Sequence, residues 1–196
     1  MKIKILPRVF SLMIAVMLAV LSAVLTWGTT QAYVFSANWS GNGATWKYGS
    51  SLPSSFQDGT SFGAYAWTSI GSSSWTYTYN SGSSNEVRYV NIDGGSGKLA
   101  ETSYWVDGQG YITQFLIEYD NQENWYTGSS TPGGSQIDLR SIAAHEFGHT
   151  LGLWHTDTTC NGTSSDATMC PFYTGGSTWW RTPATDDIAG ITDYYP

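Results

Sequence analysis

The sequence contains few positively charged residues: eight Lys and Arg stand against fifteen Asp and Glu in 196 residues. A protein that binds nucleic acid needs a basic surface to neutralise phosphates, so we expect no nucleic-acid partner. The chain also has only two cysteines and three histidines. A scaffold held by many disulfides is therefore excluded, and any histidine chemistry must use those three residues.

Long hydrophobic runs are missing as well, except at the start of the chain. Basic residues in the first eight positions precede an apolar run over residues 9–25, and small residues follow it, which is the pattern of an export signal. We therefore expect residues 1–32 to be a signal peptide and residues 33–196 to be a secreted, extracellular domain. An uncleaved membrane anchor is the alternative, because the apolar run is long for a signal.

Charged residues of either sign are scarce, at 12% of the chain, whereas aromatic residues reach 15%. Enough apolar surface is available for a packed, β-containing domain rather than a disordered tail. The length predicts one domain, which we expect to be monomeric. The two cysteines, Cys160 and Cys170, are expected to pair as a disulfide outside the cytosol; free thiols or metal ligation are the alternatives.

Secondary structure is indicated by hydrophobic periodicity. Segments rich in aromatic and β-branched residues, separated by Gly- and Ser-rich turns, are predicted as strands of one sheet at residues 64–67, 75–79, 87–90 and 111–117. A helix is predicted from near Asp138, a good N-cap residue, to about Leu151, before Gly152 can end it. A last helix is predicted over residues 186–195.

The predicted helix near Asp138 has two different faces. Apolar side chains recur every four residues at positions 139, 143, 147 and 151. His145 and His149 are also four residues apart but are offset from the apolar stripe by two residues, or roughly 200° at the helical repeat. One face therefore packs into the core while the other presents two imidazoles.

The two helical histidines form part of a zinc-binding pattern. Glu146 directly follows His145, and His149 lies one turn further on, so both imidazoles can bind one Zn²⁺ with the carboxylate beside them. Gly152 permits the turn that brings His155 back to the same ion as a third ligand. The alternative is a helix with ordinary surface or core histidines. All three histidines of the chain fall in this pattern, which favours the zinc site.

These residues resemble the signature of the metzincins, in which a Met-bearing turn follows the third histidine. Met169, Pro171 and Tyr173 are similar to the Met-turn of the matrixin branch, and residues 186–191 resemble the start of its last helix. The resemblance extends from about Trp46 to the C-terminus. It implies an α+β fold with a twisted, mostly parallel sheet, an active-site helix and a C-terminal helix.

The resemblance implies a secreted zinc-dependent endopeptidase acting on proteins or peptides. In the predicted mechanism, zinc lowers the pKa of its bound water towards about 7, and Glu146 accepts the proton as that water attacks the peptide carbonyl. Glu146 then passes the proton to the leaving amine. An extended peptide is expected to lie against the edge strand at residues 98–101.

A structural calcium site is also implied by the resemblance. An Asp-Gly loop before the substrate-pairing strand and an Asp-x-x-Glu segment after it match the matrixin pattern, and Ca²⁺ prefers six to eight oxygen ligands. The expected ligands are the carboxylates of Asp93, Asp120 and Glu123 and the carbonyl groups of Gly94, Ser96 and Lys98. The alternative is a solvated acidic turn beside a glycine loop.

The chain also departs from the matrixin pattern. The family's structural zinc needs further histidines, and Glu101 and Glu118 stand where we align two of them, so we expect that site to be lost. Two other functions are alternatives: a zinc hydrolase of non-peptide substrates, and a catalytically silent secreted module that binds through exposed tryptophans. The tryptophans required for the second are at positions 46, 67, 75, 105 and 125, although aromatic residues in strands are more often buried.

Overall fold

The computed structural model describes residues 33–95, 97–156 and 160–196. The expected signal peptide, residues 1–32, lies outside the described residues. Among the described helices, none has both the length and the apolar character needed to cross a membrane.

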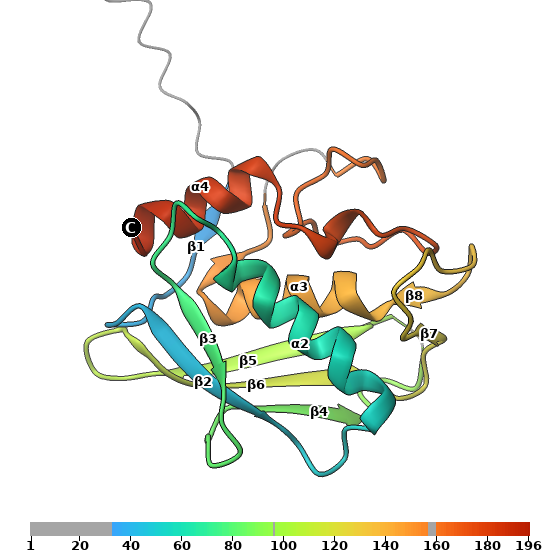
Figure 1. The fold of residues 1–196 in the computed structure, drawn as a ribbon, viewed down its shortest axis with the longest axis horizontal. Coiled ribbons are helices and arrows are strands. Elements are labelled where there is room, and N and C mark those ends of the chain that lie inside the picture. The colour runs from blue at the N-terminus through green and yellow to red at the C-terminus, as the bar shows by residue number, and fades with distance from the viewer. Residues whose placement is uncertain (1–32, 96, 157–159) are drawn as a thin grey trace, which may run out of the picture. The chain divides into compact units, whose positions relative to one another are not determined.

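A five-stranded sheet forms one layer of the domain (Figure 1). Its strand order is β3 (Thr76–Tyr79), β2 (Gly43–Tyr48), β4 (Glu86–Val90), β6 (Ile112–Asp120) and β5 (Ala100–Val106). The first four strands run parallel, whereas β5 is antiparallel to β6. This arrangement confirms the predicted α+β fold with a mostly parallel sheet, and it leaves β5 at one edge.

Two helices cover the same face of the sheet (Figure 1): α2 (Ser54–Thr68) and α3 (Leu139–Thr150). The predicted α3 is confirmed, because the Asp138 carboxylate accepts a hydrogen bond from the Ser141 amide at 2.9 Å and caps the helix. A last helix, α4 (Thr185–Tyr194), confirms the prediction over residues 186–195, and a 3₁₀ turn, η1 (Trp179–Arg181), precedes it.

The strand predicted at residues 64–67 is wrong, because this segment is the last part of α2. Buried positions in α2 recur every three or four residues from Phe56 to Trp67, which is the helical period; the short stretch Ala-Tyr-Ala-Trp only imitates alternation. Gly63 lies so close to α3 that a β-carbon would be 2.5 Å from Ala143. Close helix packing therefore stabilises α2, although its two internal glycines lower its intrinsic helix propensity.

Two small sheets complete the fold. Strand β1 (Val34–Phe35) pairs antiparallel with β9 (Leu153–Trp154), and β7 (Trp125–Tyr126) pairs parallel with β8 (Ile137–Asp138). The first pair joins the start of the described chain to the segment that follows α3. The second pair positions the residue that caps α3.

Aromatic side chains fill the space between the sheet and the helices. Trp46, Trp67 and Trp75 are buried, with 2%, 0% and 1% of their surface exposed. The Trp46 ring packs edge-on against Phe147 of α3 with centroids 5.3 Å apart. Of the five tryptophans considered for a binding surface, three are thus core residues, and Trp105 is exposed at the end of β5. Burial of this kind is how aromatic residues stabilise a core.

Candidate metal centre and cleft

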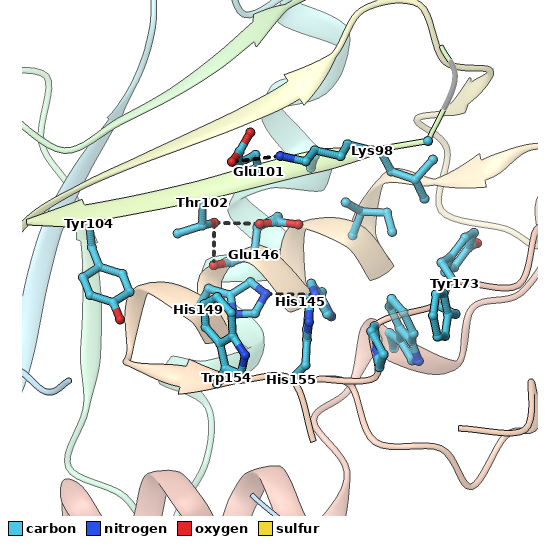
Figure 2. Close-up of a pocket in the computed structure, with 17 residues that line it drawn as sticks. Lys98, Glu101, Thr102, Tyr104, His145, Glu146, His149, Trp154, His155 and Tyr173 are labelled. Atoms are coloured by element: carbon cyan, nitrogen blue, oxygen red, sulfur yellow. Dashed lines mark hydrogen bonds and ion pairs between the residues drawn. The ribbon is translucent and has the colours of Figure 1, made fainter. Parts of the chain in front are cut away.

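His145 and His149 lie one turn apart on α3, as the sequence predicts. Both are nearly buried, because the opposite face of α3 packs its apolar stripe into the core. Their Nε2 atoms are 3.1 Å apart. The helix therefore holds two imidazoles side by side at the bottom of a cleft (Figure 2).

His155 reaches the same place because the chain turns sharply after α3. Gly152 has a φ of +93°, and a β-carbon there would collide with the carbonyl oxygen of Ala37. Only glycine satisfies both conditions. Strand β9 then pairs with β1, and His155 follows directly after β9. Ligand atoms of all three histidines therefore lie within 4.8 Å of one another.

Backbone carbonyl groups fix which nitrogen of each helical histidine faces the cluster. His145 Nδ1 lies 2.7 Å from the carbonyl oxygen of Thr168, and His149 Nδ1 lies 2.8 Å from that of Leu153. A carbonyl only accepts, so each Nδ1 must carry the proton and each Nε2 must present a bare lone pair. Two lone pairs this close repel each other unless a cation lies between them. The donor set therefore fits a zinc ion.

Burial keeps the three imidazoles neutral, which is the form that binds a metal. Burial, with a contribution from the neighbouring His149, lowers the pKa of His145 well below its usual range. The pKa of His149 falls to about 4, mainly through burial. The pKa of His155, which is less enclosed, is also lowered by burial.

Glu146 lies beside the histidines and below the edge strand (Figure 2). Only 5% of its surface is exposed, and this burial raises the pKa of its carboxyl group to about 7. A hydrogen bond from the Thr102 hydroxyl to Glu146 Oε2, 2.7 Å long, opposes that rise. A carboxyl group of this kind is suited to accepting and returning a proton near neutral pH.

The turn at Met169 supports the histidines from below. The Met169 side chain is buried and occupies the space in which a β-carbon at Gly148 would lie. Asp187 of α4 accepts hydrogen bonds from the amides of Thr168 at 2.7 Å and Met169 at 3.4 Å. The Thr168 carbonyl oxygen in turn accepts from His145. The last helix is thus linked through the turn to the first histidine.

The cleft above the histidines has a volume of about 530 Å³. One wall is β5, and the other is the segment after Met169, with Tyr173 at one end and Trp154 near the histidines (Figure 2). Trp180 stacks on His145 with ring centroids 5.0 Å apart. Pro171 and Tyr173, which the sequence assigns to the Met-turn, line this wall. Trp180 was not predicted, because no local pattern relates it to the histidines.

A family model described as matrixin matches residues 68–196, about two thirds of the chain. The chain belongs to the matrixin family. Matrixins are zinc-dependent metallopeptidases, in agreement with the histidine cluster described above.

Three relatives illustrate the extent of the similarity. The chain is 36% identical to karilysin of Tannerella forsythia over 104 residues, which is 53% of this chain and 19% of karilysin. It is 35% identical to the hatching enzyme of Paracentrotus lividus over 106 residues, which is 54% of this chain and 15% of that enzyme. It is 40% identical to stromelysin-3 of Rattus norvegicus over 82 residues, 40% of this chain and 13% of that protein. The matched region thus spans less than a fifth of each relative.

In this matrixin an ion pair links the wall of the cleft to the start of α3. Arg181 donates to the fully buried Asp138 carboxylate through Nε at 2.8 Å and Nη2 at 2.5 Å. The amide of Asp138 also donates to the Tyr173 hydroxyl at 3.0 Å. Asp138 therefore caps α3 and also anchors the cleft wall through Arg181 and Tyr173. The sequence predicts only the first role, since the second depends on a residue 43 positions away.

The predicted disulfide is present between Cys160 and Cys170, whose Cα atoms are 5.8 Å apart. It closes the loop of residues 160–170, which includes the Met169 turn. Residues 157–159, just before this loop, lie outside the described residues.

The structure brings the two parts of the expected calcium site close together. The Asp93 amide donates to Asp120 Oδ2 at 3.1 Å, and the Lys98 amide donates to Asp93 Oδ2 at 2.9 Å. Burial, followed by the charges of Asp120 and Asp93, raises the pKa of Glu123. Gly94 has the positive φ expected of a tight loop, and Ser96 lies outside the described residues. Among the His, Cys, Asp and Glu side chains of the described residues, only the three histidines bring three ligand atoms within 4.8 Å of one another.

Proposed function

We propose that the chain is a zinc-dependent endopeptidase in which His145, His149 and His155 hold the metal and Glu146 is the catalytic base. The observation that carries the proposal is the pair of Nε2 atoms 3.1 Å apart, with both Nδ1 atoms engaged by backbone carbonyl groups. That arrangement leaves lone pairs directed at one point beside a buried carboxyl group. When bound there, zinc supplies Lewis-acid chemistry that polarises a carbonyl group and acidifies water.

Glu146 provides the proton transfers of the proposed reaction. Its carboxylate accepts a proton from the attacking water at one oxygen, and the resulting carboxylic acid returns that proton to the nitrogen of the leaving amine. Both transfers require the carboxyl group to stay close to the cleft, and its position directly after His145 on α3 supports this. General acid–base catalysis of this kind contributes roughly 10²–10⁴-fold to rate.

The free edge of β5 is the proposed binding surface for an extended peptide. Among the described strands, β5 pairs with β6 on one side only, and its residues 100–102 line the cleft on the other. Main-chain hydrogen bonds along such an edge bind a peptide regardless of its sequence. The apolar part of the wall, with Ile142, Tyr173 and Trp180, would then select a side chain.

The test compares purified mature protein with two matched variants on a denatured protein substrate. Glu146→Ala should abolish cleavage while zinc remains bound at one ion per chain, because the histidines are unchanged. Glu118→Ala removes a carboxylate from β6 outside the cleft, and it should leave cleavage unchanged. Absence of bound zinc, full activity of Glu146→Ala, or hydrolysis confined to non-peptide substrates would refute the proposal.

We also propose that residues 1–32 are removed on export and that residues 33–196 form the extracellular catalytic domain. The disulfide supports this, because disulfides persist in oxidising compartments. The amino-terminal sequence and mass of protein recovered from the culture medium test it. A retained N-terminus on membrane-bound protein would favour the anchor instead.

A further inference from the structure

The carboxyl group of Glu146 has one hydrogen-bond donor among the described residues, and it is a side chain from a different element. The Thr102 hydroxyl of β5 lies 2.7 Å from Glu146 Oε2 (Figure 2). Thr102 and Glu146 are 44 positions apart in sequence. The contact therefore connects the peptide-binding edge to the proposed base.

A glutamate side chain needs such an anchor to act as a base at a fixed point. Glutamate has three side-chain torsions, and the last one, which sets the carboxylate plane, has a broad energy minimum. A hydrogen bond to Oε2 restricts that torsion and leaves Oε1 as the oxygen available to the cleft. Preorganisation of this kind avoids reorientation during the reaction.

The same hydroxyl has a second acceptor within reach. Thr102 Oγ1 is 3.2 Å from the backbone carbonyl oxygen of Glu146. A hydroxyl group has one proton to donate and two lone pairs that accept. Once Oε1 has taken a proton from the attacking water, Oε2 can still accept a hydrogen bond. Thr102 can therefore continue to donate to Oε2 or to the backbone carbonyl, and the two side chains stay in contact.

Position 102 is well placed for this role, and its neighbour offers a matched control. Residues along β5 alternate in exposure: Thr102 is half-buried and lines the cleft, whereas Ser103 is exposed and lies outside it. Both carry hydroxyl groups and both pair with β6, Thr102 with Ile117 and Ser103 with Leu116.

We propose that Thr102 is a positioning residue that fixes the orientation of the Glu146 carboxyl group through Oε2, so that Oε1 faces the substrate. This inference rests on the proposed peptidase function. It adds a requirement for a hydroxyl group at this point of the edge strand, which a peptide-binding role of the strand alone does not need.

The experiment measures kcat and KM for peptide hydrolysis by zinc-loaded wild type, Thr102→Val, Thr102→Ser and Ser103→Ala. Valine keeps the branched shape of threonine, so we expect the strand and KM to be retained, while kcat falls on the order of 10- to 100-fold through misorientation of the base. Serine restores the hydroxyl and should recover kcat to within about threefold, because the same hydrogen bond can form. Ser103→Ala should match wild type.

A second background separates positioning from a general structural effect. In Glu146→Asp the shorter side chain draws the carboxylate away from Thr102, so adding Thr102→Val should cost little further activity. An equal loss from Thr102→Val in both backgrounds, or a wild-type kcat in Thr102→Val, would overturn the inference while leaving the peptidase proposal intact. A wild-type protein with no chelator-sensitive cleavage would overturn both.

Discussion

The histidine cluster and the acidic region at residues 93–98 and 120–123 use their polar atoms in opposite ways. Each helical histidine binds the backbone through one nitrogen and leaves the other free. The carboxylates of Asp93 and Asp120 instead accept backbone amide hydrogen bonds with their oxygens. Although burial would raise the pKa of Asp120, those donors lower it. The histidines therefore present unused lone pairs to a metal, whereas Ca²⁺ at the acidic region would have to share carboxylate oxygens that already accept backbone amides.

Removal of zinc should produce the largest contrast between the two regions. At a thousandfold excess of metal over Kd, binding to the folded state contributes about 4.1 kcal/mol. Chelation should therefore abolish cleavage and lower the thermal midpoint strongly. Restoring zinc, but not calcium, should reverse both changes, as measured by metal content, calorimetry and peptide hydrolysis. An unchanged midpoint in metal-free protein would contradict a buried site.

Calcium should have a smaller effect, confined to the acidic region. At a hundredfold excess over Kd the stabilisation is about 2.7 kcal/mol, so the midpoint of zinc-loaded protein should rise in millimolar Ca²⁺. Asp120→Ala should remove most of this response without changing zinc content. Asp107→Ala is a matched control, since Asp107 also accepts two backbone amides in a turn. Identical thermal midpoints with calcium and with a calcium-specific chelator would show that these carboxylates accept backbone hydrogen bonds and bind no calcium.

Loss of the disulfide should weaken the support of the histidine site. Closing a loop with a sequence separation of 10 contributes about 2–3 kcal/mol on the chain-entropy model. The double variant Cys160→Ser/Cys170→Ser should therefore unfold at lower denaturant concentration than wild type. Reducing agent should produce the same shift in wild type and none in the variant. Recovery of both thiols free from native protein would rule the bond out.

The smallest effect is expected for Asp187, which supports His145 only indirectly, through its hydrogen bonds to the backbone of Thr168. Burial, together with the charge of Asp186, raises the pKa of Asp187 to about 7. Asp187→Asn keeps the shape but offers one accepting oxygen to the amides of Thr168 and Met169, which should cost about 1–2 kcal/mol. Asp186→Asn leaves these accepted hydrogen bonds in place and shows how much of the change comes from removing a neighbouring charge. Equal stability of Asp187→Asn and wild type in denaturant titrations would contradict this link.

The sequence predicts the elements that are determined by residues close together in the chain. Helix α3 follows from its cap at Asp138, its four-residue apolar spacing and the stop at Gly152, and these are the features the structure contains. Helix α2 escaped prediction because its stability depends on glycines that pack against α3, a contact invisible in a short window. The contacts of Thr102, Trp180 and Arg181 could not be predicted for the same reason, because each joins two residues that are distant in sequence.

The pairing of β1 with β9 has a consequence for the order in which the site assembles. The Ser36 hydroxyl donates to the Gly152 carbonyl across 116 positions of sequence. Contacts of such separation close late, because the intervening chain must first lose its conformational freedom. His155 should therefore join the other two histidines only when the sheet and helices are in place. A half-folded molecule would have no complete metal site, and on refolding, hydrolysis should return more slowly than the helical circular dichroism signal.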